Sequence, residues 1–292
     1  MSDGIPLDPA ARADQSDGEE RAHEVARDVA CQRLAIVNVA FAGLRGADSW
    51  VLIDAGLPGT AGAIERAAAE RFGAGNPPSA IVLTHGHFDH VGALETLVER
   101  WDVPVYAHRL ERPYLDGSSS YPPADPSVGG GLMATLSRFF PRSPVDLGAR
   151  LSDLPADGGV PFMPGWQWVH TPGHTPGHVS LWRASDGLLM SADACITTRQ
   201  ESAYSALTQE PEMHGPPAYF TQDWEAARAS VRALAALQPE ILVPGHGRPM
   251  RGAEMRAALE SLARDFDEVA RPAHGTYVEE PATPGDGSAY RR

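Results

Sequence analysis

The sequence contains no lysine and only two cysteines among its 292 residues. Cys31 and Cys195 lie far apart, so they form neither a disulfide framework nor a thiolate zinc site. No apolar run approaches the roughly 20 residues that cross a bilayer, and we expect no membrane span. The start of the chain lacks a basic segment followed by an apolar stretch, which favours a cytoplasmic protein. The formal net charge of −14 repels phosphates, so no nucleic-acid partner is expected.

Polarity and composition divide the chain into three parts. Residues 1–30 are polar and acidic, and we expect a disordered or peripheral arm. Residues 31–270 are long enough and apolar enough to form one large domain. Within it, segments rich in Gly, Pro and Ser at about 116–147 and 196–222 interrupt the pattern as two excursions. Residues 271–292 read as a loose C-terminal tail.

Strand patterns alternate with helix patterns inside this domain, which indicates an α/β architecture. Strands are marked by short apolar runs bounded by turn residues, and helices by apolar residues that recur every three or four positions. Strands are predicted at 34–43, 49–56, 80–84, 103–107, 167–170, 179–182, 188–190 and 241–243, and helices at 61–72, 91–101, 224–237 and 252–269.

The segment THGHFDH, residues 84–90, follows the predicted strand 80–84 and concentrates four potential metal ligands. In an extended turn His85 and His87 point to the same side, and Asp89 and His90 lie one step further on. One turn can therefore offer ligands to two metal ions. A merely solvent-facing loop rarely gathers three histidines and an aspartate, so metal binding is favoured.

This segment resembles the HxHxDH motif of the metallo-β-lactamase superfamily, and the order of later motifs agrees over roughly residues 33–270. The resemblance implies an αββα sandwich of the α/β class with two inserted loop regions. In that family the first two motif histidines and a later histidine bind one metal ion. The motif aspartate, the last motif histidine and another later histidine bind a second ion, and a further aspartate bridges both.

Three later segments match the remaining ligands of this family. His174 in HTPGHTPGH resembles the third ligand, and His246 in VPGHG resembles the last one. Asp193 follows a short strand and resembles the bridging aspartate, although a carboxylate at a strand end can equally cap a helix. His170 and His178 are expected to support the site through hydrogen bonds. The metal ligands implied by the resemblance are His85, His87, Asp89, His90, His174, Asp193 and His246.

Other residues of the excursions and their surroundings leave alternatives open. His214 either faces a substrate or is an ordinary loop histidine. Cys195 reads as a small buried filler, and Gly129–Gly131 lack the lysine of a phosphate-binding loop. Large apolar side chains of both excursions, most of them aromatic or methionine, either cover the metal ions or pack on the core or a second subunit. These side chains are Tyr121, Leu132, Met133, Phe139, Phe140, Tyr204, Met213, Tyr219 and Phe220.

The ligand chemistry points to hydrolysis. Imidazole and carboxylate suit zinc, with iron and manganese as the alternatives, and two close ions lower the pKa of a shared water toward about 7. We predict a dinuclear hydrolase that attacks an ester, thioester or lactone carbonyl of a small, fairly apolar substrate with a metal-bound hydroxide. Asp89 is the predicted catalytic residue, because it can orient the hydroxide and pass a proton to the leaving group.

Two other functions remain as alternatives, and a homo-oligomer is compatible with the sequence. One is a phosphodiester-cleaving or RNA-processing nuclease of the same fold, which the negative charge disfavours. The other is a non-catalytic metal-binding sensor or interaction protein, against which the complete ligand set argues.

Departures from individual branches of the family narrow the substrate. The β-lactam-hydrolysing members lack an aspartate at the position of Asp193, and the glyoxalase II branch carries a basic C-terminal motif that this chain does not match. The acyl-homoserine lactonase branch resembles the HFDH and HTPGH segments but has a tyrosine where Ile196 stands. Lactonase-like and thioesterase-like activities are therefore predicted together.

Overall fold

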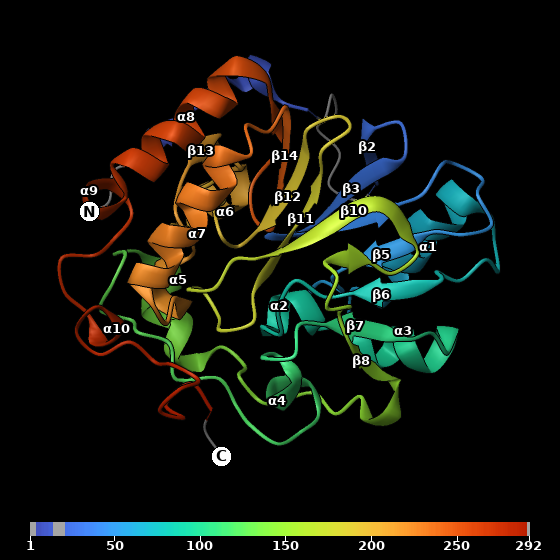
Figure 1. The fold of residues 1–292 in the computed structure, drawn as a ribbon, viewed down its shortest axis with the longest axis horizontal. Coiled ribbons are helices and arrows are strands. Elements are labelled where there is room, and N and C mark those ends of the chain that lie inside the picture. The colour runs from blue at the N-terminus through green and yellow to red at the C-terminus, as the bar shows by residue number, and fades with distance from the viewer. Residues whose placement is uncertain (1–3, 14–20, 291–292) are drawn as a thin grey trace.

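The computed structural model describes residues 4–13 and 21–290. Within these residues the strands form a seven-stranded sheet, a six-stranded sheet and a small two-stranded pair. Figure 1 shows the two large sheets side by side, with α1 and α3 outside one and α7 and α8 outside the other. The strands are β1 Ile5–Pro6, β2 His23–Ala26, β3 Val29–Leu34, β4 Val37–Ala42, β5 Val51–Ile53, β6 Ala80–Val82, β7 Val105–Ala107, β8 Leu151–Asp153, β9 Gly159–Val160, β10 Met163–His170, β11 Val179–Arg183, β12 Leu188–Ala192, β13 Glu212–Met213, β14 Ile241–Pro244 and β15 Met250–Arg251. The helices are α1 Ala61–Phe72, α2 Phe88–Val91, α3 Leu94–Trp101, α4 Arg112–Leu115, α5 Leu132–Leu136, α6 Ala203–Thr208, α7 Trp224–Ala236, α8 Gly252–Arg264, α9 Phe266–Val269 and α10 Thr276–Glu279.

Alternating side chains of the strands separate the layers. In β5, Val51 and Ile53 face the other sheet, while Leu52 packs beneath α1 and α3. In β12, Leu188 belongs to the layer between the sheets, and Leu189 packs against α7 and α8. This period of two is the consequence of strand geometry, and each fully buried aliphatic side chain contributes about 1.5–3 kcal/mol. The predicted αββα sandwich is confirmed.

Both outer layers depend on helices whose apolar residues recur at helical spacing. In α1, Ile64, Ala68 and Phe72 lie on one buried face, and Gly73 with φ of +101° ends the helix. In α7 the side chain of Asp223 accepts a hydrogen bond from the backbone N–H of Ala226 and begins the helix. No helix in the described residues is both long enough and apolar enough to cross a membrane.

The parallel pairings decide where the loops meet. Strand β5 runs parallel to β6 in the first sheet, and β12 runs parallel to β14 in the second. The loops that follow such strands leave the sheet at the same edge. The THGHFDH segment follows β6, and the segments of Asp193 and His246 follow β12 and β14. Strand topology therefore gathers the predicted ligand segments.

The N-terminal arm and the C-terminal tail differ from the sequence-based expectation. Of the arm expected at 1–30, residues 23–30 contribute β2 and the start of β3, and β1 pairs with β13. Residues 1–3 and 14–20 of the arm and residues 291–292 of the tail lie outside the described residues. The described tail packs on the domain, because the Tyr114 hydroxyl donates to the carbonyl of the buried Ala289.

Two predicted elements are broken where the sequence shows no interruption. The predicted strand 34–43 is β4 preceded by a tight turn at Ala35, which has φ of +58°, and β3 lies before that turn. The predicted helix 252–269 is divided at Asp265 into α8 and α9. In both cases side-chain pattern continues through the break, and only the backbone conformation of one residue reveals it.

Candidate metal centre

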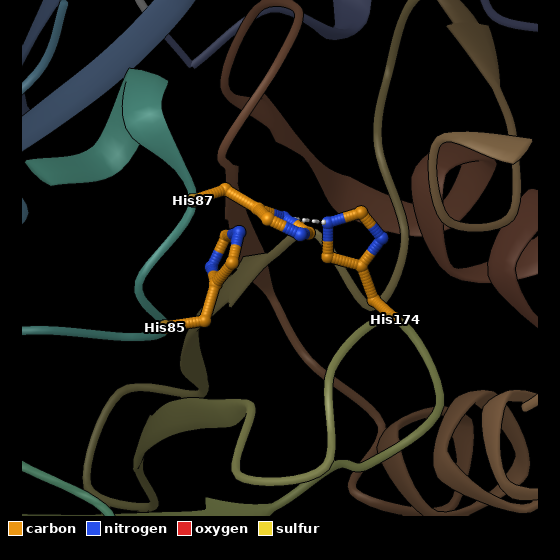
Figure 2. A group of neighbouring side chains, drawn as sticks. All are labelled: His85, His87 and His174. Carbon is orange, nitrogen blue, oxygen red and sulfur yellow. Dashed lines mark hydrogen bonds between the residues drawn. The ribbon is translucent and has the colours of Figure 1, made fainter. Parts of the chain in front are cut away.

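Three histidines from two loops form the first candidate ligand set. The imidazoles of His85, His87 and His174 converge, as Figure 2 shows, with a potential ligand nitrogen of each within 4.8 Å of the others. His85 and His87 lie in the loop between β6 and α2, and His174 lies in the loop between β10 and β11. His87 Nδ1 and His174 Nε2 are 2.9 Å apart. Each of the two sheets therefore supplies part of this set.

The second candidate set is formed by Asp89, His90 and His246, again with ligand atoms within 4.8 Å of one another. Asp89 and His90 lie in the short helix α2, not in the extended turn expected from the sequence. His246 Nε2 lies 3.5 Å from an Asp89 carboxylate oxygen. Its loop follows β14, so this set also combines both sheets.

Asp193 lies between the two sets. One carboxylate oxygen is 3.1 Å from His246 Nε2 and 3.4 Å from His174 Nε2, and the other is 3.4 Å from His90 Nε2. It also forms a further group with His85 and His90. No helix in the described part of the chain begins at Asp193, which excludes the helix-cap alternative. The structure thus brings together all seven candidate ligands implied by the family resemblance.

The chemistry of this cluster fits divalent cations. His85 Nε2, His90 Nε2 and Asp193 Oδ1 are buried and have no hydrogen-bond partner, and unpaired buried polar atoms are costly unless a ligand satisfies them. Nitrogen and carboxylate oxygen are the donors that zinc, iron and manganese take. The potential ligand atoms of each set lie within 4.8 Å of one another, so the residues fit a metal centre.

The electrostatics of the cluster also favour a positive charge beside Asp193. Burial opposes protonation of His90 and His246, but the carboxylate of Asp193 raises the pKa of both rings. Burial lowers the pKa of His85 and His87, and lowers the pKa of His174 to about 4. Burial raises the pKa of the Asp89 carboxyl. The histidines of the first set are therefore neutral and available as ligands. The second set lies beside the Asp193 carboxylate, whose negative charge attracts a cation.

Hydrogen bonds from outside the ligand set orient the ligands. His90 Nδ1 is 2.8 Å from an oxygen of Asp54, whose carboxylate also accepts from the Thr84 N–H. His246 Nδ1 donates to the carbonyl of Ile36 at 2.6 Å. His178 Nε2 accepts from the backbone N–H of Asp193 at 3.1 Å, the supporting role expected for it. The contacts of His90 and His246 direct Nε2 of each ring toward Asp193.

Asp54 and Glu111 are site residues that the sequence analysis missed. Asp54 follows β5 with φ of +60°, and the one local signal was a carboxylate at the end of a buried strand. Glu111 precedes α4 and is fully buried, with its carboxylate bonded to both ligand-bearing loops. Burial raises the pKa of Glu111 although its hydrogen bonds act in the opposite direction. No periodicity or motif marks either residue.

Several other residues fall outside the cluster. Among the described residues, none of the three candidate ligand sets includes His170, His178 or His214. His214 is buried with Nε2 3.0 Å from a Glu212 oxygen, so it has a local partner. Cys195 is buried, and burial raises the pKa of its thiol to about 12, in keeping with a structural filler.

The excursions contribute an aromatic wall beside the first set. The Phe220 ring stacks on His87 with centroids 4.6 Å apart, and Phe140 lies 6.1 Å from Phe220 and 5.5 Å from Phe88. Both excursions therefore meet next to a candidate ligand. Phe220 and Tyr219 also belong to the core beneath α7 and α8, so the wall is continuous with packed side chains.

Comparison with known families agrees with this geometry. A family model described as the metallo-beta-lactamase superfamily matches residues 34–246, which include all seven candidate ligands. The chain is 49% identical to the probable metallo-hydrolase YflN of Bacillus subtilis (strain 168), over 84% of this chain and 94% of that protein. It is 28% identical to YybB, another probable metallo-hydrolase of that organism, over 70% of this chain and 78% of the relative.

Solved structures show the same fold at low sequence identity. A beta-lactamase domain protein from Burkholderia ambifaria has a TM-score of 0.61 and 21% identity, covering 89% of this chain and 76% of its own. A B3 metallo-beta-lactamase with an active-site glutamic acid has a TM-score of 0.57 and 20% identity, covering 85% and 90%. At these identities the likeness concerns the fold and carries no information on substrate.

Proposed function

This chain belongs to the metallo-beta-lactamase superfamily and is a metal-dependent hydrolase, and we propose that it hydrolyses an ester, thioester or lactone of a small, fairly apolar molecule. We propose two divalent ions as cofactors, with zinc as the first candidate and iron or manganese as alternatives. The observation that carries the proposal is the meeting of two three-residue ligand sets on either side of Asp193. A mononuclear centre would need only one of these sets.

Different residues of the site would have different roles in hydrolysis. Divalent ions bound there would supply Lewis acidity and a water of lowered pKa. Asp89 is held within 3.5 Å of His246, and burial raises the pKa of its carboxyl, so it is suited to hold a proton and return it to a leaving group. Phe220 covers the face of His87 and excludes water from that side.

The aromatic wall supports an apolar substrate. Phe88, Phe140 and Phe220 offer ring surface next to the first ligand set, which suits an acyl or alkyl group. The same wall offers no cation to a phosphate, and the chain as a whole contains no lysine and carries a net charge of −14. These features support a small carbonyl substrate over a phosphodiester.

A substrate panel with defined metal content tests the proposal. Chelator-stripped protein would be reloaded with zinc, manganese or iron and offered esters, thioesters, lactones, β-lactams and phosphodiesters. We expect about two ions per chain and turnover of carbonyl substrates, and Asp193→Ala should lose both metal and activity. Asp186→Ala changes a carboxylate that pairs with Arg183, away from the cluster, and serves as the control. Selective cleavage of phosphodiesters, or full activity in Asp193→Ala, would refute the proposal.

A further inference from the structure

Glu111 is a buried carboxylate that joins the two loops of the first ligand set. One oxygen, Oε2, accepts from the backbone N–H of Gly86 at 3.0 Å and from the Tyr121 hydroxyl. The other, Oε1, accepts from the Thr175 hydroxyl and the Gly177 N–H, both at 2.8 Å. Four donors therefore converge on two oxygens of a side chain with no solvent exposure.

The partners of Glu111 alternate with candidate metal ligands along the chain. Gly86 lies between His85 and His87, in the loop after β6 of the seven-stranded sheet. Thr175 directly follows His174, in the loop that joins β10 and β11 of the six-stranded sheet. Glu111 thus spans the two sheets at the point where their histidines meet. Its own oxygens are occupied by donors, and it belongs to none of the candidate ligand sets found in the described residues.

The glycines of both loops are explained by this close approach. A Cβ atom on Gly177 would lie 2.7 Å from the Glu111 backbone nitrogen and 2.8 Å from Oε1. A Cβ atom on Gly86 would lie 2.8 Å from the Tyr121 hydroxyl oxygen. Both distances are shorter than real Cβ contacts, so a side chain at either position would displace Glu111 or Tyr121. The glycines next to the histidines therefore serve the connection to Glu111 and Tyr121.

We propose that Glu111 is a positioning residue that sets the distance between the His85–His87 loop and the His174 loop, and thereby the geometry of one metal site. The inference rests on the proposed metal centre. Two loops from different sheets have no covalent reason to hold a fixed spacing, and a carboxylate with four charge-assisted hydrogen bonds supplies one. Tyr121 extends the connection to the first excursion, because its ring also lies 4.3 Å from that of His87.

The isosteric change Glu111→Gln isolates this role. A glutamine side chain has one acceptor oxygen and one NH2 donor, so its NH2 group must face the backbone N–H of either Gly86 or Gly177, which cannot accept a hydrogen bond. We expect one of the two ions to bind about 10 to 100-fold more weakly, the range typical of residues that orient metal ligands. The other ion should keep its affinity. Titration of metal-free protein with zinc against a chromophoric chelator measures both affinities, and cobalt substitution reports ligand geometry through the absorption spectrum.

Matched variants separate positioning from general destabilisation. Asp125→Asn changes another buried carboxylate, which accepts from Ser127 and from the Thr276 N–H but contacts no ligand loop. Its metal affinities and cobalt spectrum should equal those of the wild type. Tyr121→Phe should shift the same site as Glu111→Gln, whereas Tyr114→Phe should not. The Tyr114 ring stacks on Tyr121, but its hydroxyl donates to Ala289.

The outcomes are distinct. Wild-type affinities and an unchanged cobalt spectrum in Glu111→Gln would overturn this inference alone, whereas a wild-type protein that binds no ion would overturn the metal centre and the inference together. If Glu111→Gln does not fold, Thr175→Val decides the question, because it removes one of the four donors. A smaller shift at the same site supports the inference, and an unchanged site overturns it.

Discussion

At the scale of single residues, the charge of each histidine depends on whether a carboxylate outweighs burial. Asp193 raises the pKa of His90 and His246 although both rings are buried. Burial prevails at His178 and His108, where it lowers the pKa to about 3 and about 4. His178 must be neutral to accept a hydrogen bond from the Asp193 N–H. Protonation of such rings opposes folding at low pH.

His108 allows this effect to be measured away from the metal cluster. Its ring stacks on His170 with centroids 4.4 Å apart, and the unfolded chain binds a proton near pH 6.5 whereas the folded chain does so near pH 4. His108 therefore does not reduce the free energy of unfolding above pH 6.5. As the pH falls from 6.5 toward 4, the free energy of unfolding decreases, because the unfolded chain binds the proton more readily than the folded chain. In His108→Phe, the loss of stability between pH 7 and 4.5 should shrink by on the order of 2 kcal/mol.

Urea unfolding of metal-free protein at several pH values tests this expectation. His274→Gln, which changes an exposed histidine of the tail, is the control and should keep the pH dependence of the wild type. If the free energy of unfolding changes equally with pH in His108→Phe and in the wild type, protonation of His108 does not oppose folding.

At the scale of elements, the two excursions form one layer around α5 and α6. The Met133 N–H donates to the carbonyl of Glu201, and the Glu201 carboxylate accepts from the Ala218 N–H. The side chains predicted to cover the metal ions differ in burial, and Met133 and Phe140 are half-buried. Tyr121, Met213, Tyr219 and Phe220 are buried, whereas Leu132, Phe139 and Tyr204 are among the exposed large apolar side chains. The buried side chains therefore pack on the core, and a covering role for the exposed ones stays a prediction.

The exposed group is the part of the layer that can be changed without disturbing the core. The triple change Leu132→Ser, Leu136→Ser and Phe139→Ser should leave metal content and folding intact, because these side chains are 59%, 40% and 70% exposed. If they contact the substrate, preference for longer acyl chains should fall several-fold, since each buried methylene contributes about 0.8 kcal/mol. The ratio of kcat/KM across a series of esters of increasing length measures this preference.

Phe162→Ser provides the matched control for this triple variant. Phe162 is also exposed but lies next to β10, outside both excursions. An unchanged ranking of esters in the triple variant would assign the exposed side chains to assembly or to no substrate contact.

At the scale of the whole molecule, the proposed metal centre lies where segments of the two sheets meet. His85 and His87 come from the loop after β6 of the first sheet, and Asp89 and His90 come from the helix α2 that follows it. His174, Asp193 and His246 come from loops of the second sheet. Asn38 in β4 joins the same halves, because its side chain donates to the carbonyls of Pro244 and Gly247. Ions bound by ligands from both sheets would stabilise the folded arrangement of the sheets, because the unfolded chain does not preserve the ligand arrangement.

Metal removal should therefore lower the thermal stability of the entire domain. Each ion present at 100 times its dissociation constant contributes about 2.7 kcal/mol to the free energy of unfolding, and its loss should lower Tm by several degrees. Differential scanning calorimetry with and without a chelator measures the change. Asp193→Ala should show little dependence on the chelator, and a wild-type Tm insensitive to metal removal would contradict the expectation.

The sequence by itself determined the local features of this protein. Candidate ligands that lie close in the chain, such as those between His85 and His90, can be recognised from local composition. The buried strand before them, β6, can be recognised as a short apolar run. Helix α1 was predictable for the same reason, because Ile64, Ala68 and Phe72 repeat with the helical period. Assigning His174, Asp193 and His246 to the same cluster required the family resemblance, since spacing alone does not join distant segments.

Only the tertiary structure decided which distant groups complete the site. Asp54 lies 36 positions from His90, and Glu111 lies 64 and 66 positions from Thr175 and Gly177, so no periodic pattern connects them. The turn at Ala35 and the break at Asp265 were hidden likewise, because each depends on the backbone angles of one residue. The periodic pattern of apolar side chains in the sequence indicates which face of a strand or helix is buried. The pairing of buried polar groups depends on how the two sheets approach one another, and that is a property of the folded molecule.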